Sequence, residues 1–297
     1  MRSKKKILIT GGNSLIGQDL VKYFIKKYFV VSTFRRKKIS LKHINLKQIK
    51  YSFNKKLNIN EKIDYLIHLA ASTPANSQIN KKMLNVNKIG IAKILNSGIK
   101  FKSIILISTL AIYGRIKKKL LDDHYKSYKS NYYGKSKILV ENHIKKYAKK
   151  NSVNYLILRL PGVIGDFSSK TTFMNKVFDS LYRHKPLTYK NPNSLTNNII
   201  HTNTLAKIIN SHICKIKRKN NTFNLCSKKR EKLKNIIQLI KLKFNSRSKI
   251  KTIDGNNSFS ISTRKVIANK IKIIDTKKTI LKTIKFYKTK NLLVKKM

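Results

Sequence analysis

The sequence predicts an α/β protein built on a doubly wound parallel sheet, with a smaller α/β cap at its carboxyl end. Three observations indicate this class. Short apolar runs alternate with stretches of helical periodicity up to about residue 160, the first run ends in Gly11-Gly12 directly before a helical stretch, and the rhythm changes after Pro161-Gly162. Strands that alternate with helices form βαβ units, whose strands pair in a parallel sheet.

The first half of the chain contains most of the expected strands. Residues 5–10 form an apolar run that ends in glycines, as a buried strand does before a tight turn, and residues 15–27 carry apolar side chains at helical spacing. Residues 28–34 are β-branched and aromatic and predict the second strand. By the same criteria we expect strands at residues 49–53, 65–69, 104–108 and 155–160, and helices at residues 80–97 and 133–149.

The second half of the chain has a less regular pattern. A chain of 297 residues is long enough for one large domain with a smaller cap. We place the boundary near residue 165, between a core of residues 1–165 and a cap of residues 166–297, and expect some late segments to return to the core. Helical spacing recurs at residues 173–183, 205–216, 233–244 and 277–287, whereas residues 186–192 fit a strand or loop and residues 222–225 a strand.

The chain is strongly basic, with 68 Lys and Arg residues against 11 Asp and Glu residues and a net charge of +57. Such a charge favours nucleic acid as a partner, because phosphate neutralisation supplies most non-specific affinity. The basic residues are spread along the whole length, however, and the abundance of Lys, Ile and Asn is typical of A/T-rich codons. We therefore attribute most of the charge to mutational drift and expect non-specific attraction of polyanions.

Nothing in the sequence predicts a membrane span, since no apolar run approaches the ~20 residues that a spanning helix needs. The basic stretch at residues 2–6 precedes an apolar run of residues 7–9, which is too short for a signal peptide. Cys214 and Cys226 lack the spacing of a zinc site or a disulfide framework, so we expect neither. The cytoplasm is the expected location.

The turn after the first strand predicts a phosphate-binding loop. Glycines let the backbone approach a ligand, and the following helix presents unpaired N–H groups and a partial positive charge. The pattern is Gly-x-x-Ser-x-x-Gly, and the alternative is an ordinary βα turn whose glycines serve geometry alone. Its place on the first strand and helix favours a phosphate loop, which would comprise Gly11, Gly12, Asn13, Ser14, Leu15, Ile16 and Gly17.

The end of the second strand indicates which dinucleotide this loop would bind. An acidic residue there binds the ribose 2′-hydroxyl of NAD, whereas arginine accommodates the 2′-phosphate of NADP. The chain has Arg35 and Arg36 at this point and no carboxylate nearby. A guanidinium group suits a phosphate, so NADP(H) is favoured over NAD(H).

Tyr133 and Lys137 suggest acid–base chemistry. A tyrosine and a lysine four residues apart lie on one face of a helix, and an ammonium beside a phenol favours the phenolate. In a lysine-rich chain this spacing also arises by chance, so the pair gains weight only from the glycine turn and from Ser108-Thr109, which precede it.

Together these segments resemble the extended short-chain dehydrogenase/reductase superfamily, in particular its NAD(P)-dependent sugar epimerase/dehydratase family. The resemblance runs from about residue 5 to residue 224 and implies a Rossmann-type core. Its anchors are Thr-Gly-Gly-x-x-x-Ile-Gly at residues 10–17, His-Leu-Ala-Ala at 68–71, Asn-Val-Asn at 85–87, Ser-Thr-x-x-Ile-Tyr-Gly at 108–114, Tyr-x-x-x-Lys at 133–137, Leu-Arg-Leu-Pro-Gly at 158–162 and the run of residues 197–206.

The resemblance implies a role for each site residue. Thr109 would hydrogen-bond the reacting hydroxyl or carbonyl, Tyr133 would be the general acid/base, and Lys137 would hold the nicotinamide ribose and bias Tyr133 towards phenolate. Strand-end capping is the alternative role for Thr109 and its neighbour Ser108. The cofactor cleft would include Leu69, Ala70, Ala71, Ser108, Leu160 and Pro161, besides Tyr133 and Lys137.

The cap departs from the family pattern where a diphosphate contact is expected. The family often has arginine at the position of Asn197. Its loss removes a contact to a nucleotide-sugar diphosphate unless Lys185, Lys190 or Arg264 replaces it. His201, in the same run, is expected to be a structural hydrogen-bonding residue.

Two further departures lie in the core. Ser14 stands where the family has a glycine in the phosphate loop. Leu110 and Ala111 follow Thr109 where dehydratases carry an Asp-Glu pair, so the acid needed to eliminate water is absent and dehydration is disfavoured.

The resemblance therefore implies an NADP(H)-using oxidoreductase or epimerase for a nucleotide-activated sugar, acting in surface polysaccharide synthesis. A dimer formed through residues 80–97 and 133–149 is the family's usual assembly. One alternative is a catalytically degenerate cofactor-binding scaffold or sensor. A further alternative is a basic RNA-binding protein on the same fold, for which the lysines and tyrosines of residues 126–132 come closest to the required pattern.

Overall fold

The computed structural model describes residues 4–53, 57–74, 77–122, 124–126, 129–166, 172–215, 220–255 and 258–294. The chain divides into two compact units, neither of which is continuous in sequence. A long segment of the second unit begins at Pro161, where the alternation of predicted strands and helices ends. Residues 205–223 belong to the first unit again. The first unit comprises Met1–Arg115, Lys126–Leu160 and Leu205–Phe223, and the second comprises Ile116–Tyr125, Pro161–Thr204 and Asn224–Met297.

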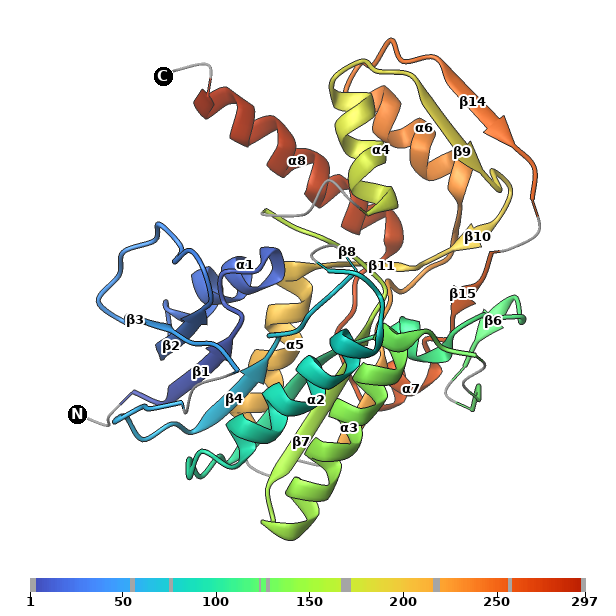
Figure 1. Cartoon of the computed structure of the whole chain (residues 1–297). Helices are drawn as coiled ribbons and strands as arrows, with labels where there is room; N and C mark the ends of the chain where they lie inside the picture. The colour runs from blue at the N-terminus through green and yellow to red at the C-terminus, as the bar shows by residue number, and fades with distance from the viewer. Residues whose placement is uncertain are drawn as a thin grey trace. The chain divides into compact units, whose positions relative to one another are not determined.

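The first unit is organised by a sheet whose strands are β1 (Lys6–Thr10), β2 (Phe29–Phe34), β3 (Leu46–Lys50), β4 (Tyr65–His68), β5 (Ser103–Thr109), β7 (Asn154–Leu160) and β12 (Asn221–Asn224). Their order is β12-β7-β5-β4-β1-β2-β3, and the strands from β7 to β3 pair in parallel (Figure 1). The chain builds outward from β1 to one side and then to the other, so the order reverses between β1 and β4. The prediction of a doubly wound parallel sheet is confirmed.

Helices cover both faces of this sheet (Figure 1): α1 (Leu15–Phe24), α2 (Lys81–Leu95), α3 (Tyr132–Lys150) and α5 (Thr202–Cys214). Apolar side chains of α2 and α3 share one core with Leu8 of β1 and Leu66 of β4. Alternation along β1 turns Ile7, also fully buried, to the opposite face. On that side Tyr28, which follows α1, donates its hydroxyl hydrogen to Asn210 Oδ1 of α5 at 2.8 Å.

The third strand begins three residues earlier than the sequence predicts, at Leu46 instead of residue 49. Pairing with β2 sets its ends, from Val30 opposite Leu46 to Phe34 opposite Lys50. None of its residues is fully buried, so this edge strand lacks the apolar signal on which the prediction depends. The other strands and helices predicted in the first unit are observed, with ends that differ by up to three residues.

The second unit combines short paired strands with helices. β8, β9 and β6 pair in parallel with β11, β14 and β15, whereas β10 and β13 are antiparallel. Most of these strands are too short to give a periodic sequence signal. Of them, β9 alone overlaps a segment, residues 186–192, for which a strand or loop was expected. The elements are β6 (Leu120–Leu121), β8 (Gly162–Ile164), α4 (Phe173–Tyr182), β9 (Leu187–Lys190), β10 (Leu195–Thr196), β11 (Ile199–His201), β13 (Glu231–Lys232), α6 (Leu233–Lys243), β14 (Ile250–Ile253), β15 (Ser260–Ile261), α7 (Arg264–Ala268) and α8 (Thr276–Val294).

A separate core holds the second unit together. Phe178 of α4, Ile240 of α6 and Ile280 of α8 are fully buried in it. Phe178 also stacks on Tyr287 of α8, with ring centroids 5.5 Å apart and planes at 20°. Helix α8 is longer than the predicted residues 277–287. Its packing through Ile280 and Tyr287 attaches it to the core of the second unit.

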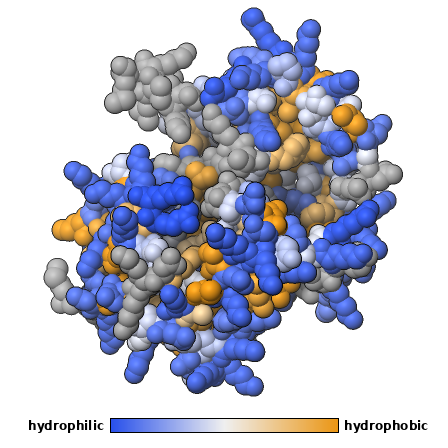
Figure 2. All heavy atoms as spheres, viewed as in Figure 1, coloured by the Kyte–Doolittle hydropathy of each residue, from blue (hydrophilic) through white to orange (hydrophobic). Residues whose placement is uncertain are grey.

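Figure 2 shows hydrophilic side chains distributed across this view, with smaller hydrophobic groups between them, as the even distribution of basic residues in the sequence leads one to expect. Of the lysine- and tyrosine-containing segment 126–132, Ser127 and Tyr128 lie outside the described residues. Of the helices that the structure describes, none is long and apolar enough to cross a membrane.

Candidate active site

The turn between β1 and α1 packs against the end of β4, where the strand order reverses. Gly11 has a φ of +70°, and a Cβ there would lie 2.9 Å from the backbone of Ala70. A Cβ on Gly17 would lie 2.4 Å from the carbonyl oxygen of Gly11, and one on Gly12 would lie 2.0 Å from Ser32 Oγ. Gly11 and Gly17 therefore require glycine, because a Cβ there meets backbone atoms, and Gly11 requires it also for its backbone conformation.

Ser14 caps α1. Its Oγ accepts a hydrogen bond from the backbone N–H of Gly17 at 3.1 Å, so the serine stabilises the first helical turn. Asn13 Nδ2 donates to the carbonyl oxygen of Lys37 at 3.1 Å and ties the loop to the segment after β2. Leu15 is 40% exposed and Ile16 half-buried in the first turn of α1. The positive end of the α1 dipole therefore lies beside the crevice in which doubly wound sheets bind phosphates.

The neighbouring strand ends complete this crevice. Arg35 and Arg36 follow β2 directly, and both are exposed. Leu69, Ala70 and Ala71 follow β4 and are half-buried. The tight glycine turn, the first turn of α1 and these strand ends are the elements from which doubly wound sheets build a dinucleotide site.

The catalytic pair predicted from the sequence comes together in the first unit. Tyr133, in the first turn of α3, is hydrogen-bonded to the side chain of Thr109 at the end of β5. Gly134 permits this approach, because a Cβ there would lie 2.3 Å from the carbonyl oxygen of Ala111. Asn131 caps the helix by accepting the N–H of Gly134 at 3.0 Å.

Lys137 is buried one turn further along α3. Its Nζ donates a hydrogen bond to the carbonyl oxygen of Ile107 at 2.7 Å. Burial lowers the pKa of Lys137 to about 8, and the charge of Glu141 opposes this shift. For Tyr133, burial raises the pKa above its ordinary value, and the hydrogen bond with Thr109 counters this only in part. Burial of the phenol thus sets the direction of this pKa shift, and the bias of Tyr133 towards phenolate by Lys137 stays a prediction.

Ser108, Leu160 and Pro161 are placed differently from one another. Leu160 is buried and lies opposite Thr109 in the pairing of β5 with β7. Pro161 belongs to the second unit. Ser108 Oγ donates to Glu141 Oε1 at 2.6 Å, so its hydroxyl faces the protein interior and the residue would contribute to a cofactor cleft only through its backbone.

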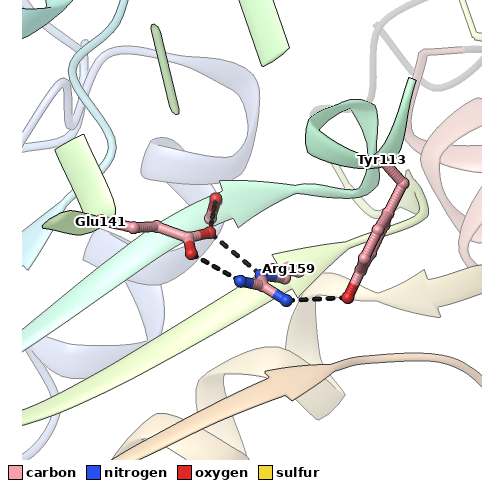
Figure 3. Close-up of polar contacts among 4 residues, drawn as sticks. Tyr113, Glu141 and Arg159 are labelled. Atoms are coloured by element: carbon pink, nitrogen blue, oxygen red, sulfur yellow. Dashed lines mark hydrogen bonds and ion pairs between the residues drawn. The ribbon is translucent and has the colours of Figure 1, made fainter. Parts of the chain in front are cut away.

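Glu141 and its partner Arg159 were not predicted from the sequence, but they lie beside the proposed catalytic residues. Arg159 donates from Nε to Glu141 Oε1 at 3.1 Å and from Nη2 to Oε2 at 2.8 Å (Figure 3). Glu141 follows Lys137 by four residues, as Lys137 follows Tyr133. This repeated spacing on one helix face was the available signal.

The second unit contains a cavity of about 690 Å³. Thr172 Oγ1, Asn191 Oδ1 and Asn198 Oδ1 in its wall are buried and have no hydrogen-bond partner among the described residues. Buried polar atoms are normally paired, so these oxygens are available to hydrogen-bond a molecule that enters the cavity. The wall is formed by Gly162, Thr172, Phe173, Met174, Thr188, Tyr189, Lys190, Asn191, Ser194, Thr196, Asn197, Asn198, Ile199, Leu233, Ile236, Ser258, Phe259 and Thr276.

Asn197 has a structural role where the family often has arginine. Its Nδ2 donates to the carbonyl oxygens of Ser227 at 3.1 Å and Ile261 at 2.9 Å, and its Oδ1 accepts the N–H of Ile261 at 2.8 Å. The amide is thus used within the protein. Of the three cations expected as replacements, Lys190 lines the cavity.

His201 serves the backbone, as expected. Its Nδ1 accepts a hydrogen bond from the N–H of Asn203 at 3.1 Å, at the start of α5. Burial, aided by the charge of Lys282, lowers the pKa of His201 to about 4, so the neutral ring is the form present near neutral pH.

Potential metal ligands do not gather in the part of the chain that the structure describes, where no group of three His, Cys, Asp or Glu side chains could hold a metal ion. Cys214 is exposed and Cys226 is buried, and the two do not form a disulfide with each other.

Comparison with known proteins gives one family and a set of similar folds. The model of the NAD dependent epimerase/dehydratase family matches residues 7–226. A comparison with curated proteins found no significant match.

Solved structures of sugar-nucleotide epimerases share the fold over nearly the whole chain. UDP-glucose 4-epimerase from Thermotoga maritima is 16% identical, with 96% of this chain and 99% of that chain covered and a TM-score of 0.81. UDP-glucuronic acid 4-epimerase from Bacillus cereus, in complex with NAD, is 18% identical, with 96% and 99% covered and a TM-score of 0.78. UDP-N-acetylglucosamine 4-epimerase from Methanobrevibacter ruminantium is 19% identical, with 98% and 100% covered and a TM-score of 0.79.

Proposed function

Since the chain belongs to the NAD dependent epimerase/dehydratase family, we propose that it is an NAD(P)-dependent epimerase or keto-sugar reductase that acts on a nucleotide-activated sugar. The family resemblance inferred from the motifs is confirmed by the match to residues 7–226. The observation that carries the proposal is the hydrogen bond between Tyr133 and Thr109, next to buried Lys137. This is the arrangement that proton transfer to or from a sugar oxygen requires.

Tyr133 moves the proton in this proposal. Because burial keeps its pKa above the ordinary value, Tyr133 holds its proton near neutral pH and donates it to a carbonyl oxygen that is being reduced. Thr109 orients the same oxygen through its hydroxyl group. Lys137, positively charged below about pH 8, holds the ribose of the dinucleotide and stabilises Tyr133 after its proton has left. The dinucleotide, when bound, supplies or accepts the hydride.

The cavity of the second unit is proposed to bind the nucleotide half of the substrate. Its three buried acceptors call for N–H or O–H donors, which a pyrimidine base and a ribose both supply. Lys190 in its wall offers a charge for the diphosphate, a role that Asn197 no longer fills. The similar solved epimerases act on UDP-sugars, according to their descriptions, so UDP-sugars are the first substrates to test.

The preference for NADP(H) over NAD(H) is part of the proposal. Arg35 and Arg36 are exposed directly after β2, at the position that contacts the adenosine ribose in doubly wound sheets. A guanidinium group there binds a 2′-phosphate. An NADP(H) preference favours net reduction, because an epimerase returns the hydride to its substrate and keeps its cofactor.

Dehydration remains disfavoured in this proposal. The chain turns from β5 into the 3₁₀-helix Leu110–Tyr113, which begins with Leu110 and Ala111. Neither side chain can donate a proton to a departing hydroxyl. An elimination would therefore lack its general acid.

The proposal is tested by incubating the full chain with each reduced and oxidised dinucleotide and a panel of UDP-glucose, UDP-N-acetylglucosamine and UDP-glucuronic acid. Products are identified by proton NMR. An inverted or reduced sugar in one of these mixtures supports the proposal. Binding of both ligands without any product would favour the scaffold reading, and no binding of either would overturn the proposal.

A further inference from the structure

Glu141 carries a buried carboxylate one helical turn after Lys137 and two turns after Tyr133. It is 2% exposed, in a chain with only 11 acidic residues. Tyr133, Lys137 and Glu141 are spaced by four residues each and therefore lie along one face of α3. The face that carries the proposed chemistry thus continues one turn deeper into the protein.

Three successive residues at the end of β5 hold these three side chains. Thr109 is hydrogen-bonded to Tyr133, and Ser108 Oγ donates to Glu141 Oε1 at 2.6 Å. The carbonyl oxygen of Ile107 accepts from Lys137 Nζ at 2.7 Å. Helix α3 is therefore fixed to β5 at each of the positions that the reaction uses, and a shift at one contact displaces the others.

Arg159 fixes Glu141 from the neighbouring strand. Its guanidinium group grips both carboxylate oxygens, at 3.1 and 2.8 Å, the bidentate geometry that is strongest for this pair. Its third nitrogen, Nη1, donates to Tyr113 OH at 2.7 Å, and its Cζ lies 5.4 Å from the centroid of the Tyr113 ring (Figure 3). Tyr113 closes the 3₁₀-helix that follows Thr109, so the network surrounds the end of β5.

Glu141 also affects the protonation of Lys137. Burial disfavours the ammonium form of Lys137, and Glu141 is the group that opposes this. Tyr133 lies one turn before Lys137 and holds its proton, and the pKa of His68 of β4, which the charge of Lys137 helps to lower, is about 3. Neither supplies a negative charge. The charged group against Glu141 is the cation Arg159.

We propose that Glu141, clamped by Arg159 and Ser108, is a positioning residue that keeps Lys137 protonated and α3 in register with the end of β5. Arg159 acts through Glu141, since its guanidinium group contacts the carboxylate and not the lysine. The proposal rests on the proposed function only where it takes Lys137 to contact the dinucleotide.

The test is a double-mutant cycle in the free protein. Urea unfolding is measured for the wild type, Lys137→Met, Glu141→Gln and the double variant, at about pH 7 and about pH 9.5. We expect the two substitutions to be coupled at the lower pH, by about tenfold in the unfolding equilibrium constant, and uncoupled at the higher pH, where Lys137 is neutral. Equal coupling at both values, or none at either, would overturn the proposal, because a purely structural Glu141 predicts no dependence on the charge of Lys137.

Asp64 provides the matched control. It accepts the N–H of Lys6 at 2.9 Å and pairs with Lys102 at 2.7 Å in the first unit, away from the proposed catalytic pair. Asp64→Asn removes a carboxylate that is also ion-paired, although it lies closer to the surface than Glu141, and its cycle with Lys137→Met should show no coupling at either pH. Coupling of the same size would mean that Lys137 responds to any lost carboxylate, which contradicts the assignment to Glu141.

A titration with NADH and NADPH separates this inference from the proposed function. The wild-type affinity should fall with rising pH as Lys137 loses its proton, and in Glu141→Gln the midpoint should move about one pH unit lower. If the wild type binds neither NADH nor NADPH, the proposed function fails, while the cycle in the free protein still decides the inference. If either binds and the midpoint of Glu141→Gln is unchanged, the inference fails and the proposed function stands.

Discussion

The two units of the protein differ in how their functional polar groups are bonded. In the first unit, Thr109, Tyr133 and Lys137 have hydrogen-bond partners within the protein. In the second unit, acceptors of Thr172 and Asn198 line a cavity and have no partner among the described residues. Since an unpaired buried acceptor costs free energy, the proposed nucleotide site would gain more from hydrogen-bond donors of its ligand than the already bonded groups of the first unit would.

The two units also differ in their relation to the family. The family match ends at residue 226. Leu233, Ile236, Phe259 and Thr276 in the wall of the cavity lie beyond that residue, whereas the glycine turn, Thr109, Tyr133 and Lys137 all lie within it. In the proposed function, the reacting residues thus lie within the family match, and the proposed nucleotide site is formed in part by residues beyond it.

The largest expected effect is that of Tyr133→Phe. Without the phenol hydroxyl no proton is exchanged with the sugar oxygen, so turnover should fall about 10²–10⁴-fold. Binding of a UDP-sugar to the second unit should not change. The measurement is the rate of product formation by NMR, with calorimetry for binding. Tyr132→Phe is the matched control, because Tyr132 is 42% exposed at the adjacent position. Equal losses in both variants would contradict the assignment of Tyr133.

Arg35→Asp should change cofactor choice within the first unit alone. A charged hydrogen bond to the 2′-phosphate contributes about 1.5–3 kcal/mol, so NADPH affinity should fall about 10–100-fold relative to NADH. Fluorescence titration with both dinucleotides measures the ratio. Lys38→Asp makes the same charge change at an exposed position three residues on. An equal drop for both variants would show that bulk charge, and not Arg35, selects the cofactor.

Acidification should destabilise the first unit through His68. Burial and then the charge of Lys137 lower the pKa of His68 to about 3, far below its value of ~6.5 in the unfolded chain. The unfolded state therefore binds more protons between these values, and stability falls as the pH falls. From about pH 7 to about pH 5 the loss should be about 2 kcal/mol, and His68→Gln should remove it.

Urea unfolding at both pH values measures this dependence. His201→Gln tests the same effect in the second unit, where the pKa of His201 is lowered to about 4. A pH dependence that survives in His68→Gln would show that His68 is not its source.

The change in UDP-sugar affinity in Thr172→Val is expected to be small, but it tests the cavity of the second unit alone. In Thr172→Val, the lost hydroxyl has no partner among the described residues, so thermal stability should stay constant or rise. UDP-sugar affinity should fall about 2–10-fold, the value of one neutral hydrogen bond.

Thr279→Val is the counterpart for this prediction. Thr279 is buried in α8, and its Oγ1 donates to the carbonyl oxygen of Asp275 at 3.0 Å. Stability should fall in this variant while UDP-sugar affinity stays constant. The opposite pattern in the two variants would contradict a ligand role for the cavity acceptors.

The sequence allowed the fold of the first unit to be predicted because its elements carry local signals. The strand of residues 6–10 is a buried apolar run, and the helix that follows Ser14 has helical periodicity and a capping residue. The proposed catalytic residues Tyr133 and Lys137 could be picked out together because they lie four residues apart on one helix. Their partner Glu141 lies at the same spacing, but only the structure shows that Arg159, from a separate strand, completes its bonding.

The second unit could be predicted only in part. Its helices have apolar periodicity, but strands such as Leu195–Thr196 and Glu231–Lys232 are defined by their pairing alone. The cavity depends on residues distributed between Gly162 and Thr276, so no local pattern reveals it. The raised pKa of Tyr133 was likewise hidden, because the spacing to Lys137 shows the charge but not the burial.

In the proposed function, the first unit binds one dinucleotide at the β1–α1 turn. The most direct test is fluorescence titration of the full chain with NADH and NADPH at near-physiological salt, repeated after doubling the salt concentration. We predict saturable binding of one dinucleotide per chain, tighter for NADPH, that changes little with salt. Binding that exceeds one per chain and disappears with salt would be polyanion attraction to a +57 protein, and it would contradict the account.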